Sequence, residues 1–172
     1  MRLIVPAVIS VLLAGTLSSF AAESPSLPEE TGAGLFSCHA PVGWKKKDMP
    51  TGGVRYSDGR RSISVMRYGG EGSAYATPEI FFKRLNDFAK LEKRDPARVS
   101  GREADRFIRS YELSLGGDEY PAQKEWIYEE LVILKEGETF WVLKFQSPSR
   151  LPADSPKGLA LWRRFLKSFR LL

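Results

Sequence analysis

The stretch that most constrains the fold of this chain lies near its C-terminus, at Thr139–Phe145. It is rich in aromatic and branched residues, which favour β-strands. Successive side chains of a strand point to opposite faces. Both faces of this one are apolar: Trp141, Leu143 and Phe145 on one side, Phe140 and Val142 on the other. A strand that is apolar on both faces has to be covered on both faces.

A C-terminal helix can supply one cover. Apolar residues recur there at steps of three or four, the spacing of one helix face. We predict a helix over Pro156–Arg170, with Ser155 as its N-cap. The apolar stripe consists of Leu159, Trp162, Leu166 and Phe169.

A second helix in mid-chain can cover the other face. Thr77-Pro78-Glu79 combines a capping hydroxyl, a proline in the first turn and an acid at the positive helix end. We expect this helix to end near Arg94, before Pro96. Its apolar stripe consists of Phe81, Leu85 and Phe88.

The remaining periodic segments predict strands joined by short turns. Glu125–Leu134 is apolar on both faces and is therefore expected in the centre of the sheet. The other predicted strands are Leu35–Ala40, a hairpin of Val54–Ser57 and Ser62–Met66 turning at Asp58-Gly59, and the half-exposed Glu103–Leu115. This order predicts an α+β fold: a three-layer α/β/α sandwich around a central, mostly antiparallel sheet.

The N-terminus is typical of a secretory signal peptide. Arg2 precedes the apolar run Leu3–Leu17, and small residues follow at Ser19 and Ala21. We expect cleavage after Ala21, with cleavage one residue later and an uncleaved anchor as alternatives. The predicted organisation is a signal peptide at 1–21, a flexible lead at 22–34 and a single domain at 35–172. The mature protein is then periplasmic or secreted and has no transmembrane segment.

Charge and cysteine content narrow the class of partner. The chain has 26 Lys and Arg against 21 Asp and Glu, and loss of Arg2 with the signal peptide lowers the net charge from +5 to +4. This excess suits an acidic partner or simply a solvated surface. Export and the lack of a recognition motif argue against nucleic acid. With Cys38 as the only cysteine, no intramolecular disulfide can form.

The sequence offers few groups for catalysis or metal binding. Cys38 and His39 are neighbours on a predicted strand and point to opposite faces, so Cys38 is interpreted as a buried structural residue. The acidic pair Glu29-Glu30 lies in the lead, and the pair Glu129-Glu130 alternates between faces. Gly69–Gly72 lacks the spacing of a phosphate-binding loop. We therefore predict no catalytic residue, no cofactor and no metal site.

Candidate contacts with a partner lie in two basic clusters. Aromatic and arginine side chains often anchor interfaces, whereas exposed charges that only aid solubility are the alternative for each residue. The predicted partner-binding residues are Trp44, Lys45, Lys46, Lys47, Arg60 and Arg61.

Three stretches resemble the PsbP-like family. The segment Phe36–Trp44 is similar to its opening strand and Pro-x-Gly-Trp turn, and the helix start Thr77-Pro78 and the ending Phe165–Phe169 match its later elements. The family shares an α/β/α sandwich with Mog-type Ran-binding proteins, and the resemblance spans Leu35–Leu172. It implies a non-enzymatic accessory or binding protein. The chain has one histidine and no evident acidic metal cluster, so no family binding residue is transferred.

Together these features predict an exported, non-enzymatic binding or accessory protein. We expect it to dock on a larger protein partner in the cell envelope, an acidic one if the basic clusters take part. Two alternatives stay open: a small-ligand carrier with a pocket between helix and sheet, and a hydrolase that uses His39.

Overall fold

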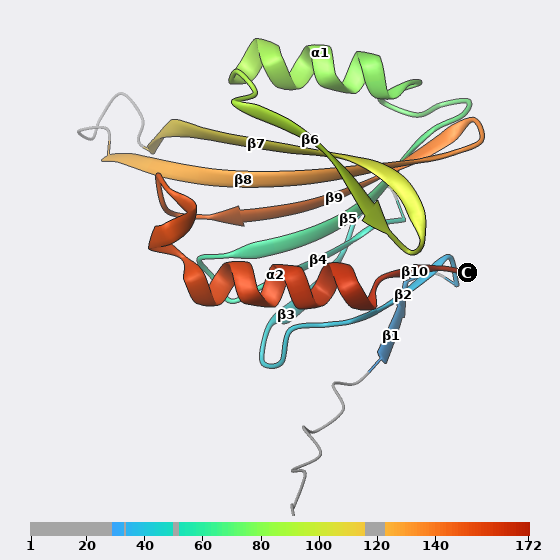
Figure 1. Cartoon of the computed structure of the whole chain (residues 1–172), viewed down its shortest axis with the longest axis horizontal. Coiled ribbons are helices and arrows are strands. Elements are labelled where there is room, and N and C mark those ends of the chain that lie inside the picture. Colours follow the sequence, from blue (N-terminus) through green and yellow to red (C-terminus); the bar gives the residue numbers. More distant parts are fainter. Residues whose placement is uncertain (1–28, 33, 50–51, 116–122) are drawn as a thin grey trace, which may run out of the picture.

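The computed structural model describes residues 29–32, 34–49, 52–115 and 123–172. The predicted signal peptide and most of the predicted lead lie outside these residues. Figure 1 shows the arrangement of the strands and helices. The elements in chain order are β1 (Glu29–Gly32), β2 (Phe36–His39), β3 (Lys45–Asp48), β4 (Val54–Ser57), β5 (Ser62–Gly69), α1 (Pro78–Phe88), β6 (Lys93–Val99), β7 (Arg102–Leu115), β8 (Gln123–Glu136), β9 (Thr139–Ser147), a 3-10 turn (Pro152–Asp154), α2 (Pro156–Ser168) and β10 (Arg170–Leu171).

Seven of these strands form one antiparallel sheet in the order β3-β4-β5-β9-β8-β7-β6. Strand β9, which contains the doubly apolar segment Thr139–Phe145, lies between β5 and β8. Trp141 and Phe140 are each 1% exposed although they point to opposite faces. The predicted central, mostly antiparallel sheet is therefore confirmed, and both faces of β9 are covered.

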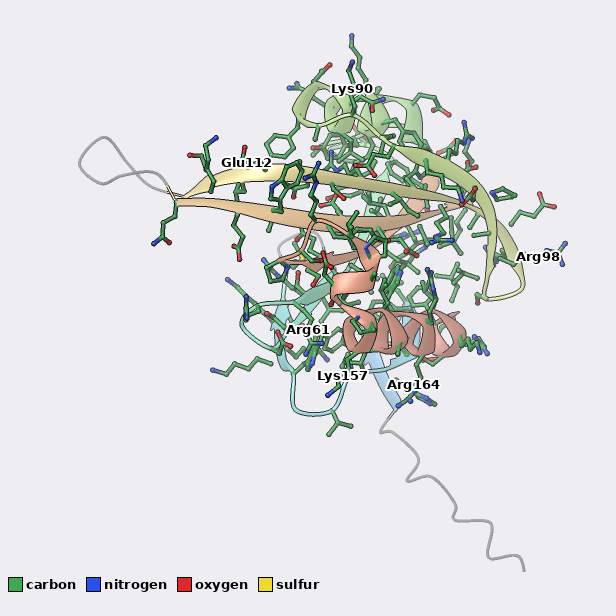
Figure 2. All side chains as sticks on the ribbon, turned by 60° about the vertical axis from the view of Figure 1, so that its left-hand side comes forward. Arg61, Lys90, Arg98, Glu112, Lys157 and Arg164 are labelled. Atoms are coloured by element: carbon green, nitrogen blue, oxygen red, sulfur yellow. The ribbon has the colours of Figure 1, made fainter. Side chains whose placement is uncertain are left out.

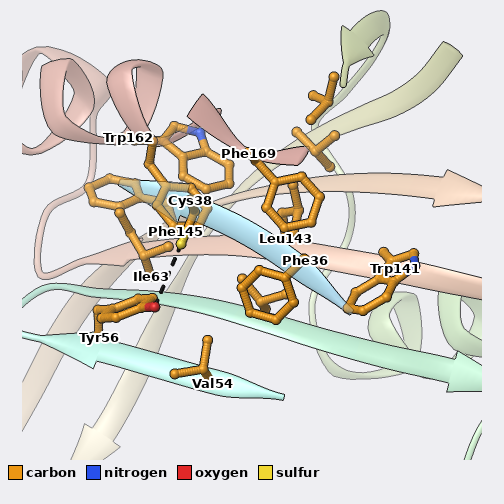
Figure 3. Packing of buried hydrophobic residues seen from close by; sticks show 14 of the residues in the cluster. Phe36, Cys38, Val54, Tyr56, Ile63, Trp141, Leu143, Phe145, Trp162 and Phe169 are labelled. Atoms are coloured by element: carbon orange, nitrogen blue, oxygen red, sulfur yellow. Dashed lines mark hydrogen bonds between the residues drawn. The ribbon is translucent and has the colours of Figure 1, made fainter. Parts of the chain in front are cut away.

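The two helices cover different faces of this sheet (Figure 1). Phe81 of α1 packs with Phe140 and Val142, whereas Trp162 of α2 packs with the residues that alternate with them, such as Phe145. Figure 3 shows the larger core, in which the Trp162 and Phe145 rings stack with centroids 6.1 Å apart. Alternate side chains of β9 therefore pack on different helices: one set lies under α1 and the other under α2.

Helix α1 begins as predicted and ends earlier. Thr77 Oγ1 accepts a hydrogen bond from the Ile80 N–H at 3.3 Å, so the predicted N-cap is confirmed. The helix ends at Phe88, not near Arg94. Asn86 Oδ1 accepts the Leu91 N–H at 3.2 Å, which stabilises a turn in place of further helix.

The chain between this helix and β7 forms a strand that the sequence analysis missed. Lys93–Val99 is strand β6, at the edge of the sheet. Pro96 argues against a strand in this segment, because proline cannot donate a hydrogen bond to a neighbouring strand. A strand at the edge of a sheet nevertheless tolerates proline. The hairpin to β7 turns at Ser100 and Gly101, both with positive φ (55° and 74°).

The first predicted strand belongs to a second, smaller sheet. Strand β2 pairs with β1 and with the C-terminal β10, in the order β1-β2-β10. Phe36 is fully buried there, and its ring lies 5.4 Å from that of Phe169 and 5.7 Å from that of Trp141. The interpretation of residues 22–34 as a flexible lead is wrong at 29–32, which form β1 by pairing with β2.

Two local features go beyond the predictions. Lys45–Asp48, for which no strand was predicted, forms the outermost strand β3. Ser155 occupies the N-cap position of α2 without a capping bond from its side chain. Its hydroxyl instead forms a hydrogen bond with the Ser147 hydroxyl at 3.0 Å, which links the helix start to the end of β9.

Cys38 should be unreactive in the native protein. Its side chain is fully buried, and its Sγ lies 3.6 Å from the Tyr56 hydroxyl (Figure 3). An aromatic disulfide reagent should label the folded protein far more slowly than the protein in denaturant, since the thiolate must reach solvent to react. Equal labelling rates in the two conditions would contradict this burial.

Candidate functional site

The structure brings the predicted partner-binding residues together at one edge of the main sheet. We call Trp44, Lys45, Lys46, Lys47, Arg60 and Arg61 the basic edge. The three lysines lie on the outermost strand β3, and all are exposed. Lys45 pairs with Ser57, the last residue of β4, so the Lys45 end of β3 lies beside the β4–β5 turn that carries the two arginines. Lys47 lies two positions further along the strand, beside Arg55.

Arg61 has a structural role within the basic edge. Its Nε donates to Asp58 Oδ2 at 2.7 Å, and its guanidinium lies 5.6 Å from the centre of the half-buried Trp44 ring. Asp58 Oδ1 also accepts the backbone N–H groups of Arg60 and Arg61, at 3.0 and 2.7 Å. Arg61 therefore holds the turn and covers Trp44, while Arg60 projects from the same turn and is exposed.

The electrostatics of this turn favour an ionised Asp58. Partial burial of the carboxyl raises its pKa, but the hydrogen bonds from the backbone and side chain of Arg61 and from the backbone of Arg60 outweigh burial. The pKa of Asp58 is consequently below its ordinary value. The ionised Asp58 carboxylate therefore stabilises the folded protein at pH values above its unfolded-state pKa. This stabilisation is lost as the pH falls through the lower pKa of the folded state.

A cleft lies beside the basic edge. It has a volume of about 510 Å³ and extends from the β4–β5 turn to the start of α2. Arg60, Arg61 and Lys157 line it together with Asp58 and Asp154. Figure 2 shows Arg61 and Lys157 on this side of the molecule. The acids offset most of the positive charge, so the cleft by itself does not select an anion.

Two buried carboxylates were missed as features of the fold. Glu129 and Glu130 are neighbours on the central strand β8, 1% and 0% exposed, and they point to opposite faces as predicted. Their burial could have been inferred from the sequence, because both lie inside a segment that is apolar on both faces. A buried carboxylate requires cations or hydrogen-bond donors around it.

Glu129 faces α1 and is paired with Arg109. Arg109 Nη2 lies 2.6 Å from Glu129 Oε1, and the Arg109 side chain is itself 4% exposed. The same guanidinium donates to the carbonyl oxygens of Leu85 and Ala89, at 2.8 and 3.3 Å. Arg109 thus satisfies carbonyl groups at the C-terminal end of α1, where a cation is favourable.

The other partners of Glu129 lie on the two strands next to β8, namely β9 and β7. Gln146 donates to Glu129 Oε2 at 2.8 Å, and Lys144 Nζ lies 4.0 Å from the same atom. Burial lowers the pKa of Lys144, an effect that the Glu129 charge opposes and the Arg109 and Arg55 charges reinforce. Burial also raises the pKa of Tyr111, and the Glu129 charge adds to this rise. The side chains of Arg109, Glu129, Lys144, Gln146 and Tyr111 thus find hydrogen-bond or ionic partners within this network.

Glu130 faces α2 and is surrounded by donors. Trp162 Nε1 donates to its Oε1 at 2.7 Å, Arg163 Nη2 donates to its Oε2 at 3.1 Å, and Arg106 Nη2 donates to the same Oε2 at 3.2 Å. The Tyr128 hydroxyl also donates to Oε2 at 3.2 Å. Burial, together with the Glu130 charge, raises the pKa of Tyr128 to about 12. One carboxylate is therefore shared by two guanidinium groups.

The groups considered for catalysis lie apart. Cys38 is buried on one face of β2, while the backbone N–H of the half-buried His39 donates to Ser168 Oγ at 2.9 Å. Glu129 and Glu130 lie on opposite faces of the sheet, so they share no site. In the described part of the chain, no group of three or more His, Cys, Asp or Glu side chains is placed to hold a metal ion.

Comparison with known proteins gives structural neighbours only. No family model matches the sequence, and no curated protein matches it. A cyanobacterial PsbP from Synechocystis sp. PCC 6803 is 13% identical with a TM-score of 0.48, over 92% of this chain and 100% of that one. The Ran-binding protein Mog1p of Saccharomyces cerevisiae is 13% identical with a TM-score of 0.48, over 85% of this chain and 96% of that one.

A third neighbour is much longer. A Bacteroides thetaiotaomicron protein is 13% identical with a TM-score of 0.49, and the match covers 83% of this chain but only 47% of that one. Both protein types named by the predicted resemblance are thus among the solved structures similar to this chain. Likeness at these identities concerns the fold alone.

Within the described residues, neither helix has the length and apolar character to span a membrane.

Proposed function

We propose that this chain is an exported, non-enzymatic binding protein with a three-layer α/β/α fold, and that its basic edge docks on an acidic surface of a larger envelope partner. The observation that carries the proposal is the gathering of Lys45, Lys46 and Lys47 on an exposed outer strand, beside Arg60 and Trp44. Edge lysines also deter unwanted strand pairing. Charge reversal of the lysines separates this role from docking.

Charge complementarity favours an acidic partner. Strand β3 pairs Lys47 with Arg55 of β4, an exposed residue that adds a further cation beside Lys47 on the same face of the sheet. Arg61 holds the β4–β5 turn in place, so Arg60 is presented from an ordered backbone. Ordered cations lose less conformational entropy when they bind. The surface therefore fits a rigid acidic patch on a folded partner.

Reversing the charge of the basic edge should weaken docking. Lys45→Glu, Lys46→Glu and Lys47→Glu together should reduce affinity by roughly 3- to 150-fold, since three exposed ion pairs contribute roughly 0.6–3 kcal/mol. The partner is first identified by a photo-crosslinker at position 47 in intact envelopes, then purified and titrated. Binding should also fall as salt rises, because exposed charges are screened over about 8–10 Å.

A matched control separates this effect from net charge. Lys83, Arg84 and Lys90, in and just after α1, are exposed and lie away from β3. Their reversal to Glu changes the net charge equally and should leave affinity unchanged. Circular dichroism should show both variants folded. Equal weakening by both triple variants, or salt-independent binding that survives the Lys45–Lys47 reversal, would leave the edge lysines with a solubilising role.

A separate experiment tests the prediction that the protein is exported and its signal peptide removed. Expression of the full chain in a bacterial host with a periplasm should give a mature protein that begins at Ala22 and fractionates with the periplasm. The physical reason is the short apolar run after Arg2 and the small residues Ser19 and Ala21. N-terminal sequencing checks this, and a membrane-bound product that retains Met1 would support the uncleaved anchor.

A further inference from the structure

The three lysines of the basic edge do not all face the same side of the sheet. Successive residues of a strand point to opposite faces, so the lysines of β3 divide between the two faces. Lys46 pairs with Tyr56, which belongs to the core under α2, and therefore faces α2. Lys45 and Lys47 lie on the opposite face, which is the face that α1 covers in part. We call it the α1 face.

On the α1 face a row of polar residues extends from the basic edge to the middle of the sheet. Lys47 pairs with Arg55, and Arg55 pairs with Ser64 on its other side. Ser64 pairs in turn with Lys144. Because directly opposite residues of antiparallel strands share a face, these residues form one row across β3, β4, β5 and β9, which adjoin in that order (Figure 1). At a strand spacing of about 4.8 Å, the row spans roughly 14 Å.

The two faces of these four strands differ in charge. The structure describes all four strands, and the one acid within them is Asp48. Asp48 pairs with Val54, so it lies on the α2 side of the sheet, two positions from Lys46. The charged side chains of these strands on the α1 face are Lys45, Lys47, Arg55 and Lys144. The α2 side of β3 is therefore balanced in charge, whereas the α1 face is basic.

The cations at the inner end of the row repel one another. Lys144 Nζ lies 4.0 Å from Glu129 Oε2, but Glu129 is already paired with Arg109 at 2.6 Å. Burial lowers the pKa of Lys144, and the charges of Arg109 and Arg55 lower it further. An anion placed beside Arg55 and Lys144 would offset this repulsion.

The exposure of the row favours a narrow partner over a flat one. Arg55 is exposed, whereas the side chain of Lys144, on the inner strand β9, is 25% exposed. Helix α1 covers another part of the same face, where Phe81 packs on Tyr68 and Phe140. A flat surface such as a membrane would meet the helix and the outer lysines before it reached Lys144. A protein segment beside the helix can contact the whole row.

We propose that an acidic segment of the partner protein lies across β3, β4, β5 and β9 on the α1 face, with its carboxylates on Lys47, Arg55 and Lys144. Lys46 then points away from the partner. This inference rests on the proposed docking function and adds to it the face of contact and two cations outside the basic edge. Arginine forms paired hydrogen bonds with carboxylates, so Arg55 suits an Asp or Glu of that segment.

Calorimetric titration with the peptide octaglutamate at low salt tests the face of contact. Lys47→Glu should weaken octaglutamate binding by about threefold to tenfold. Lys46→Glu makes the same change of charge at the neighbouring exposed position and should weaken binding by less than about twofold.

A second pair of variants tests the inner part of the row. Arg55→Gln/Lys144→Gln should weaken octaglutamate binding by about threefold or more. Lys83→Gln/Lys90→Gln removes the same charge from exposed positions in and just after α1 and should bind like the wild type. Circular dichroism should show every variant folded, and Arg55→Gln alone replaces the double variant if the loss of Lys144 prevents folding.

Each other outcome overturns the proposal in a distinguishable way. Equal weakening by Lys46→Glu and Lys47→Glu would contradict the assigned face and leave the basic edge as a docking surface. Wild-type affinity in the Arg55/Lys144 variant would confine the contact to β3. Octaglutamate binding that even reversal of all three lysines leaves unchanged would contradict the proposed docking as well. Sedimentation with phosphatidylglycerol vesicles, without binding of octaglutamate, would indicate a membrane surface in place of an acidic segment.

Discussion

Replacing Trp162 with alanine should lower the free energy of unfolding by about 3–5 kcal/mol, the usual cost of removing a large buried aromatic side chain. Trp162 is fully buried between the Phe145 and Phe165 rings, at centroid distances of 6.1 and 5.9 Å. Its Nε1 also donates to Glu130 at 2.7 Å, and truncation removes that donor. The expected fall in Tm is roughly 6–20 °C, measured by circular dichroism.

A conservative variant separates packing from hydrogen bonding. Trp162→Phe keeps an aromatic ring in the stack and loses only the N–H donor and part of the volume. It should be destabilised by less than half as much as the alanine variant. An alanine variant with the Tm of the wild type would mean that α2 is not packed on the sheet as described.

Replacing Arg109 with methionine should destabilise the protein by about 3–5 kcal/mol, because it leaves a buried carboxylate without its closest cation and only Lys144, 4.0 Å away, to pair with it. Arg109 Nη2 is 2.6 Å from Glu129 Oε1, and both side chains are excluded from solvent. The substitution also removes the donors to the Leu85 and Ala89 carbonyl oxygens. Chemical denaturation checks the loss through the denaturant midpoint.

The matched controls use a surface pair and a second substitution. Arg94 pairs with Asp105 at 3.0 Å, but their side chains are 67% and 35% exposed, so Arg94→Met should cost no more than about 1 kcal/mol. Adding Glu129→Gln to Arg109→Met removes the buried charge and should recover part of the lost stability. An equal loss in the Arg94 and Arg109 variants would show that burial of the pair contributes nothing.

The main sheet could be predicted because burial leaves a direct pattern in the sequence. The two apolar sets of β9 lie on opposite faces of the sheet as predicted, and β8 is likewise buried on both faces. Asp58-Gly59 lies in the predicted turn, with Gly59 at a φ of 96°, which glycine adopts without strain. Thr77 caps its helix for the reason read from the sequence. These features depend on neighbours within a few positions.

Features that depend on distant partners left no such pattern. The end of α1 at Phe88 reflects a side-chain bond from Asn86, and β6 is a strand because β7 pairs with it in spite of Pro96. The residues of the basic edge could be chosen from their types alone. Only the pairing of β3 with β4 shows that the lysine cluster lies near the arginine cluster.

The neighbouring glutamates of β8 have a consequence for strand alignment. Glu129 is tied through Arg109 to the end of α1, and Glu130 is tied through Trp162 and Arg163 to α2. A slip of β8 by one residue would reverse the face of every side chain. Each carboxylate would then be buried under the helix that lacks its cation, at a cost of several kcal/mol. Two adjacent charges thus specify a single register for the strand at the centre of the domain.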